Sequence, residues 1–258
     1  MEEIFFVRFS LQQSCGIFGA NQFDCNDIIS EPKEQVAQYI AECSKWQEQK
    51  AEEFRRKHRG ILKLGGKKVL YIGDSLTADR LGYRGITTVA AGLDARSMAV
   101  SGATSVDMLR SVYGEVLKLK PEIISVLIGA NDALFVGGKD KVNLVGKEEY
   151  RRNLREILKV CKESGAIVLV LTIPDVSEKN LSQSNDSRIK TNDNENVSEY
   201  CNIVRDEAQR AGVVLVDLNR ALKAYNIEEM IEPDGVHLNK KGQLMLADLW
   251  LETLIEEV

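Results

Sequence analysis

The sequence predicts an α/β fold in which a five-stranded parallel sheet lies between two layers of helices. From Lys68 onward, short and continuously apolar runs alternate with longer amphipathic stretches, the pattern of strand–helix units around a buried sheet. With 44% hydrophobic residues in a chain of 258, there are enough apolar side chains for such a core. We therefore expect a three-layer α/β/α domain at residues 67–258, with right-handed crossovers between its strands.

Five apolar runs in this region have the length of buried strands. They lie at residues 69–72, 97–100, 123–128, 167–173 and 213–216. Between and after them, apolar residues recur every three to four positions, which predicts helices at residues 106–119, 147–163, 199–211 and 240–257. The polar stretch at residues 177–196 is predicted to be a loop near the rim of any site at that edge of the sheet.

Residues 1–66 do not share this alternation and are predicted to form an N-terminal extension. Apolar and polar residues alternate along residues 5–12, with Arg8 on the polar face, which suggests a half-buried strand. Apolar residues from position 36 to 54 fall along one stripe and predict an amphipathic helix. The basic run at residues 55–59, which includes His58, is interpreted as the solvated end of that helix.

Charge and cysteine content exclude several classes of function. The chain has 34 Lys+Arg and 39 Asp+Glu, a formal charge of −5, and no long basic tract, so we expect no nucleic-acid partner. The start of the chain is acidic and no run of about 20 apolar residues occurs, so we expect a cytoplasmic protein with no membrane span. The five cysteines form no CxxC pair, and we expect neither a metal nor another cofactor.

Polar residues follow three of the predicted strands directly, and a fourth polar block follows the last strand after a connection. In parallel sheets, ligands bind beyond the carboxyl ends of the strands, so these residues are the candidates for a site. The first strand is followed by Gly73-Asp74-Ser75-Leu76-Thr77, the second by Ser101-Gly102-Ala103-Thr104, the third by Gly129-Ala130-Asn131-Asp132, and the fifth, after a connection, by Pro233-Asp234-Gly235-Val236-His237.

One serine and one histidine in these blocks suggest nucleophilic chemistry. A serine hydroxyl attacks an ester only with help from a base whose pKa lies near 7, and imidazole is the natural choice. The chain has only two histidines, and His58 lies in the charged helix end outside the domain. His237 follows Asp234 by three residues, a spacing at which one turn brings carboxylate and ring together. Asp74 and Asp132 are assigned to the geometry of their turns.

As a set, the four blocks resemble the SGNH hydrolase, or GDSL esterase/lipase, family over about residues 67–258. The resemblance implies that Ser75 is the nucleophile, His237 the general base and Asp234 its orienting carboxylate. It also implies an oxyanion hole made by the backbone N–H groups of Ser75 and Gly102 and the side-chain amide of Asn131. The flavodoxin-like strand order 2-1-3-4-5 that the family implies places Ser75 between those two donors.

The leading hypothesis is a cofactor-free serine esterase that hydrolyses short-acyl or acetyl esters of small molecules through an acyl-Ser75 intermediate. A lysophospholipase or thioesterase acting on longer acyl chains is one alternative, because acyl length depends on pocket walls. Another is a non-catalytic binding module with a hydrolase fold, docked to a partner through residues 1–66, and the same extension could form a homo-oligomer. A phosphate-binding flavodoxin-like protein is disfavoured, because no GxGxxG sequence follows the first strand.

Overall fold

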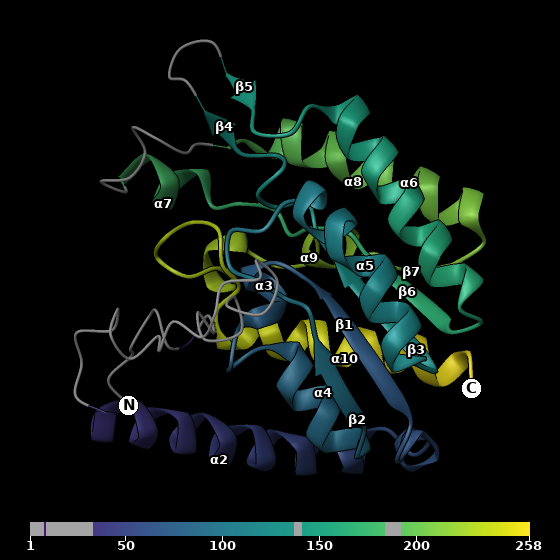
Figure 1. Cartoon of the computed structure of the whole chain (residues 1–258). Helices are drawn as coiled ribbons and strands as arrows, with labels where there is room; N and C mark the ends of the chain where they lie inside the picture. Colours follow the sequence, from purple (N-terminus) through teal and green to yellow (C-terminus); the bar gives the residue numbers. More distant parts are fainter. Residues whose placement is uncertain (1–7, 9–32, 137–140, 184–191) are drawn as a thin grey trace.

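The computed structural model describes residues 8, 33–136, 141–183 and 192–258, and its centre is a parallel sheet (Figure 1). The sheet has five strands in the order β2-β1-β3-β6-β7, as the resemblance implies. These strands are β1 (Lys68–Gly73), β2 (Asp94–Ser97), β3 (Ile123–Leu127), β6 (Ile167–Leu171) and β7 (Val214–Val216). A short antiparallel hairpin, β4 (Phe135–Val136) with β5 (Val142–Asn143), stands apart from it.

Helices cover both faces of the sheet, as predicted. One face carries α5 (Ser105–Leu119), α6 (Lys147–Glu163) and α8 (Asn194–Ala211), and the other carries α4 (Tyr83–Ala91) and α10 (Lys240–Glu256), with α2 (Lys33–Lys57) outside α4 (Figure 1). Shorter helices are α3 (Ser75–Ala78), α7 (Glu178–Gln183), α9 (Leu218–Leu222) and the 3-10 turns η3 (Ile61–Leu64) and η5 (Ile227–Glu229). No helix in the described ranges has both the length and the apolar character needed to cross a membrane.

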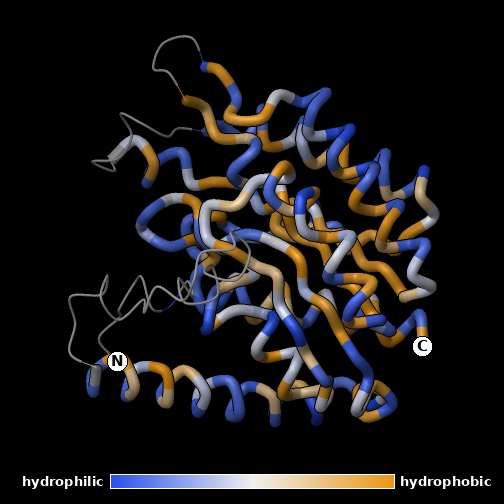
Figure 2. The backbone as a smooth tube through the Cα atoms, in the orientation of Figure 1, coloured by the Kyte–Doolittle hydropathy of each residue, from blue (hydrophilic) through white to orange (hydrophobic). Residues whose placement is uncertain are grey.

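The central strands are mostly apolar, and they are buried along almost their whole length because helices cover them on both sides. Every residue of β3 is buried, as is every residue of β1 except Lys68. The hydropathy colouring shows the same pattern, with apolar colour on the strands and on the inward faces of the helices (Figure 2). A polar or charged residue at these positions would lose its water without a partner, which explains the continuous apolar runs.

The second strand lies three residues earlier than predicted. The prediction placed it at residues 97–100, whereas β2 is Asp94–Ser97 and pairs with β1 from Lys68↔Asp94 onward. As the edge strand of the sheet, β2 is only partly covered, so its sequence Asp-Ala-Arg-Ser has no apolar run. The apolar residues after it are buried but belong to the connection toward α5.

The predicted helices are present, but the helices α3, α4, α7 and α9 were not predicted. The helix at residues 147–163 agrees with α6 at both ends, whereas α8 begins five residues before the predicted position 199. Helix α4 was not predicted, because Gly85 and several β-branched residues lower its helix propensity, and packing against α2 and α10 holds it. Helix α7 lies within the predicted polar loop.

The end of α2 is exposed to solvent at four of its five basic residues, as predicted, but the fifth, His58, is buried. His58 is only 7% exposed, and its Nε2 lies 2.8 Å from Asp248 Oδ1 of α10. Phe54 and Ala51 belong to the same buried cluster as the sheet, so the helix is docked by its apolar stripe. The strand predicted at residues 5–12 lies outside the described residues except for Arg8, whose backbone is helical and whose side chain is buried.

Candidate active site

Ser75 lies at the sharp turn between β1 and α3. Asp74 is the N-cap of α3 and accepts a hydrogen bond from Leu76 N at 3.0 Å, the turn role predicted for it. Gly73 must be a glycine, because a Cβ there would lie 2.5 Å from Leu127 O and would also strike Thr77. The tight turn leaves Ser75 partly exposed at the carboxyl edge of the sheet.

Two hydrogen bonds within the loop of His237 hold its ends together, one between backbone groups and one to a side chain. Glu232 N donates to His237 O at 2.7 Å, and Asp234 Oδ1 accepts from His237 N at 3.0 Å. Gly235 has a φ of 82°, and a Cβ at this position would lie 2.8 Å from atoms of Leu181 in α7. A glycine is therefore required both for the turn and for its close packing.

Ser75, His237 and Asp234 form one hydrogen-bonded chain. His237 Nε2 lies 2.7 Å from Ser75 Oγ, and His237 Nδ1 lies 2.5 Å from Asp234 Oδ2. Burial alone would raise the pKa of Asp234, but hydrogen bonds from the His237 ring and from two backbone amides lower it below its usual value. The ionised carboxylate accepts only, so Nδ1 carries the ring hydrogen and Nε2 accepts from the serine hydroxyl. This arrangement can take a proton from Ser75.

The second and third sequence blocks lie beside the turn of Ser75. Val100 N donates to Gly73 O at 3.1 Å, and Gly73 is paired in register with Leu127 at the end of β3. The Asn131 side-chain amide donates to Ala103 O at 2.9 Å, so it lies next to Gly102. An amide nitrogen carries two hydrogens, and this bond uses one of them.

Asp132 is held deeper than its neighbour Asn131. Both of its carboxylate oxygens lie 3.0 Å from Ser105 N at the start of α5, so it joins two loops, as a turn residue does. Burial raises the pKa of Asp132 to about 6, and burial likewise raises the pKa of Asp74 to about 7. Both carboxyl groups therefore ionise less readily than exposed ones.

One buried residue near the site was missed by sequence reasoning. The alternating pattern placed Arg8 on a polar face, but its side chain is 1% exposed and forms an ion pair with Asp79. No motif or spacing links Arg8 to Asp79, 71 positions away. Only the folded chain brings the two together, because a buried guanidinium needs a carboxylate partner.

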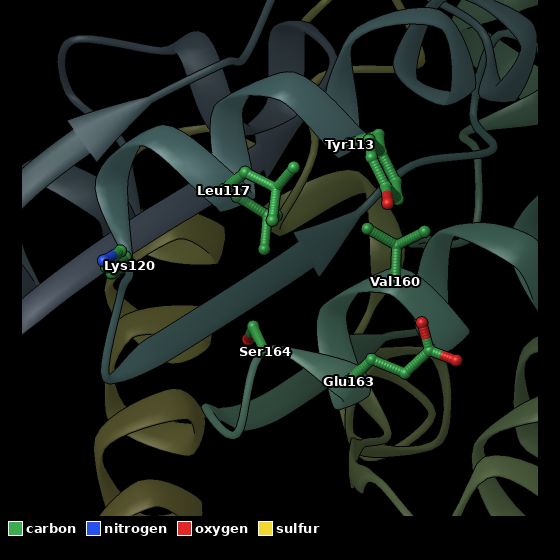
Figure 3. Close-up of a pocket in the computed structure, with 7 residues that line it drawn as sticks. Tyr113, Leu117, Lys120, Val160, Glu163 and Ser164 are labelled. Atoms are coloured by element: carbon green, nitrogen blue, oxygen red, sulfur yellow. The ribbon is translucent and has the colours of Figure 1, made fainter.

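A groove between α5 and α6 lies away from this edge of the sheet (Figure 3). Its volume is about 460 Å³, and it is lined by residues near the C-terminal ends of the two helices, among them Tyr113, Leu117, Lys120, Val160 and Glu163. These ends lead into the amino ends of β3 and β6, whereas Ser75 follows the carboxyl end of β1. The groove is therefore separate from the site.

One cluster in the described ranges has the composition of a metal site. Atoms of His58, Asp248 and Glu252 lie within 4.8 Å of one another. Lys57 already forms ion pairs with both carboxylates, so its ammonium group supplies the positive charge that a metal ion would bring. The cluster fastens the end of α2 to α10.

Comparison with known proteins places the chain in a family. Residues 71–244 match the GDSL-like Lipase/Acylhydrolase family, so the chain belongs to this family and is a carboxylic ester hydrolase. No curated protein matches the sequence.

Solved structures share the fold. The acetyl xylan esterase AlAXEase is 20% identical, with a TM-score of 0.57, over 72% of this chain and 98% of its own. The lipase/acylhydrolase from Enterococcus faecalis is 22% identical, with a TM-score of 0.58, over 74% of this chain and 96% of its own. A catalytic mutant of an acetylxylan esterase from Geobacillus stearothermophilus is 23% identical, with a TM-score of 0.57, over 74% of this chain and 94% of its own.

Proposed function

We propose that this protein is a serine esterase that acts through an acyl-Ser75 intermediate, with His237 as general base and Asp234 as its orienting carboxylate. The observation that carries the proposal is the hydrogen-bonded chain in which His237 Nε2 faces Ser75 Oγ at 2.7 Å. Nucleophile, base and orienting group lie in the order and at the distances that such catalysis needs.

In the first half of the reaction, Ser75 Oγ attacks the carbonyl carbon of the ester and its proton passes to His237 Nε2. The imidazolium that forms is stabilised by the ionised Asp234. The tetrahedral intermediate then collapses, the carbon–oxygen bond of the alcohol breaks, and the alcohol oxygen takes the proton from Nε2. An acyl group remains on Ser75.

In the second half, water attacks the acyl carbon and gives its proton to His237 Nε2. Collapse breaks the bond to Ser75 Oγ, which takes this proton back, and the carboxylic acid leaves. The residues are thereby returned to their starting state without any cofactor.

The oxyanion of each intermediate needs hydrogen-bond donors. We assign the backbone N–H groups of Ser75 and Gly102 and the side-chain amide of Asn131 to this role. Neither backbone amide donates a hydrogen bond to any described residue, so both are free to bind an oxyanion. Donors of this kind each contribute about 2.7–4 kcal/mol to the stability of the transition state.

We infer that the preferred substrates are acetyl or other short-acyl esters. Two of the similar solved structures are acetylxylan esterases, which supports a small acyl group. Hydrolysis rates measured for a series of p-nitrophenyl esters from acetate to palmitate test this. We expect the highest kcat/KM for acetate and no hydrolysis by Ser75→Ala. A maximum at long chains would favour the lysophospholipase or thioesterase alternative, and no hydrolysis by the wild type would contradict the proposal.

A further inference from the structure

We propose that Arg8 is a positioning residue for the reaction: it ties the loop after Ser75 to the loop that carries His237. This inference rests on the proposed function, since it concerns the same two reacting side chains. Arg8 precedes α2 in the sequence by more than twenty positions, and its side chain contacts both Asp79, four residues after Ser75, and Glu232, five residues before His237.

Arg8 holds the loop after Ser75 by two parallel hydrogen bonds. Its Nε lies 2.9 Å from Asp79 Oδ1 and its Nη2 lies 2.9 Å from Asp79 Oδ2. Asp79 is the C-cap of α3, and its backbone N–H donates to Ser75 O at 3.0 Å. The same carboxylate accepts from Leu81 N at 2.8 Å, so the ion pair fixes the whole turn.

Arg8 also holds the loop of His237. Its Nη1 lies 2.7 Å from Glu232 Oε1, and its Nη2 donates to Leu238 O at 3.2 Å. Glu232 and Leu238 flank the segment that contains Asp234 and His237, and Glu232 N donates to His237 O. One guanidinium group therefore contacts both ends of the loop that presents the base.

The contacts couple two parts of the chain that the sheet does not join directly. Asp79 is fully buried and Arg8 is 1% exposed, so neither side chain can exchange its partner for water. Arg8 O further accepts a hydrogen bond from Arg80 N at 2.8 Å, which fixes the backbone at its position. A planar guanidinium with several fixed donors suits this role, whereas a single ammonium group cannot bridge as many acceptors.

Loss of the bridge should misplace the base relative to the nucleophile. Small errors in the placement of reacting groups reduce rates by up to about 100-fold. We expect Arg8→Gln to lower kcat for p-nitrophenyl acetate by about 10- to 100-fold, with KM changed much less, because Arg8 acts through the two loops.

The matched control is Arg155→Gln. Arg155 also makes two hydrogen bonds to a buried carboxylate, that of Glu207, at 2.9 and 2.7 Å, but this pair joins α6 to α8. We expect the control to keep its kcat within about twofold, since it leaves both catalytic loops intact. Thermal melting of both variants shows whether each is folded at the assay temperature.

A second variant applies if Arg8→Gln does not fold. Glu232→Ala removes only the partner that is 22% exposed and leaves the Arg8–Asp79 pair in place. We expect a smaller decrease of kcat, of about 3- to 10-fold. If Arg8→Gln folds and keeps the wild-type kcat, the proposal is overturned. If Arg8→Gln does not fold, a wild-type kcat in Glu232→Ala overturns it.

Proton NMR separates this inference from the proposed function. The Nδ1 proton that His237 shares with Asp234 should give a strongly downfield signal, which His237→Ala removes and His58→Gln leaves unchanged. We expect this signal to broaden or vanish in folded Arg8→Gln and to remain in Ser75→Ala and Arg155→Gln. If the wild type hydrolyses no ester, the proposed function fails, while an unchanged signal in Arg8→Gln contradicts the positioning role by itself.

Discussion

His237 Nε2 lies 2.7 Å from Ser75 Oγ, although the two residues are 162 positions apart in the sequence. Ser75 follows the second strand of the sheet in spatial order, whereas the segment with His237 follows the strand at the far edge. The connection after β7 must therefore cross the carboxyl edge of the sheet to reach Ser75, and α9 and η5 lie along it.

The pH dependence of hydrolysis should follow His237. We expect kcat/KM to increase as the pH is raised toward neutrality, because only a neutral imidazole can accept the serine proton. The residual activity of His237→Ala should show no such rise. Burial raises the pKa of nearby Asp74 to about 7, so Asp74→Asn is the control, and it should retain the rise. If Asp74→Asn lost the rise while His237→Ala kept it, the pH dependence would belong to Asp74, and its assignment to His237 would be wrong.

Asn131→Ala should reduce kcat by about 100- to 1000-fold with little change in KM, because an oxyanion donor acts in the transition state. Asn143→Ala is a suitable control. Asn143 also donates its side-chain amide to a backbone carbonyl, Ala133 O at 3.1 Å, but it lies in the β4–β5 hairpin. Steady-state kinetics of both variants check this, and equal losses in the two would argue against an oxyanion role.

Asp132→Asn should change how stability depends on pH. Burial raises the pKa of Asp132 from 3.8 to about 6 in the folded protein. Between these values the folded chain holds a proton that the unfolded chain has released, so wild-type stability falls as the pH rises from about 4 to 6. The variant has no carboxyl group here and does not lose this stability. Between pH 4 and 6, the free energy of unfolding of the variant minus that of the wild type should therefore increase by up to about 3 kcal/mol. Urea unfolding of both proteins at pH 4 and pH 7 measures this difference in the free energy of unfolding. The same difference at both pH values would contradict a raised pKa of Asp132.

Phe54→Ala should destabilise the whole protein by about 3 kcal/mol, because Phe54 is buried in the main core and stacks on His58. Gln49→Ala, on the exposed side of the same helix, should change stability by less than about 0.5 kcal/mol. Urea unfolding followed by circular dichroism compares them. An unchanged midpoint in Phe54→Ala would mean that α2 contributes nothing to the stability of the sheet domain.

Much of the fold could be predicted because buried strands and amphipathic helices leave periodic patterns. The errors occur where tertiary contacts, rather than local pattern, decide the outcome. The edge strand β2 has no apolar run, and His58 is buried between Phe54 and Asp248 of α10. Three of the four polar blocks could be found because they follow predicted strands directly, and the block with His237 because it follows the last strand after one connection. Arg8 could not, since its role depends on two distant carboxylates that nothing in its neighbourhood predicts.

The most direct test of the central claim is covalent labelling of the folded protein with a fluorophosphonate, followed by peptide mass spectrometry. A serine activated by an adjacent imidazole attacks the phosphorus, and the fluoride leaves. We expect one adduct per chain, on Ser75, and a rate that falls by at least about 1000-fold in His237→Ala. No adduct on the wild type, or an adduct on another serine while Ser75 stays unmodified, would contradict the account.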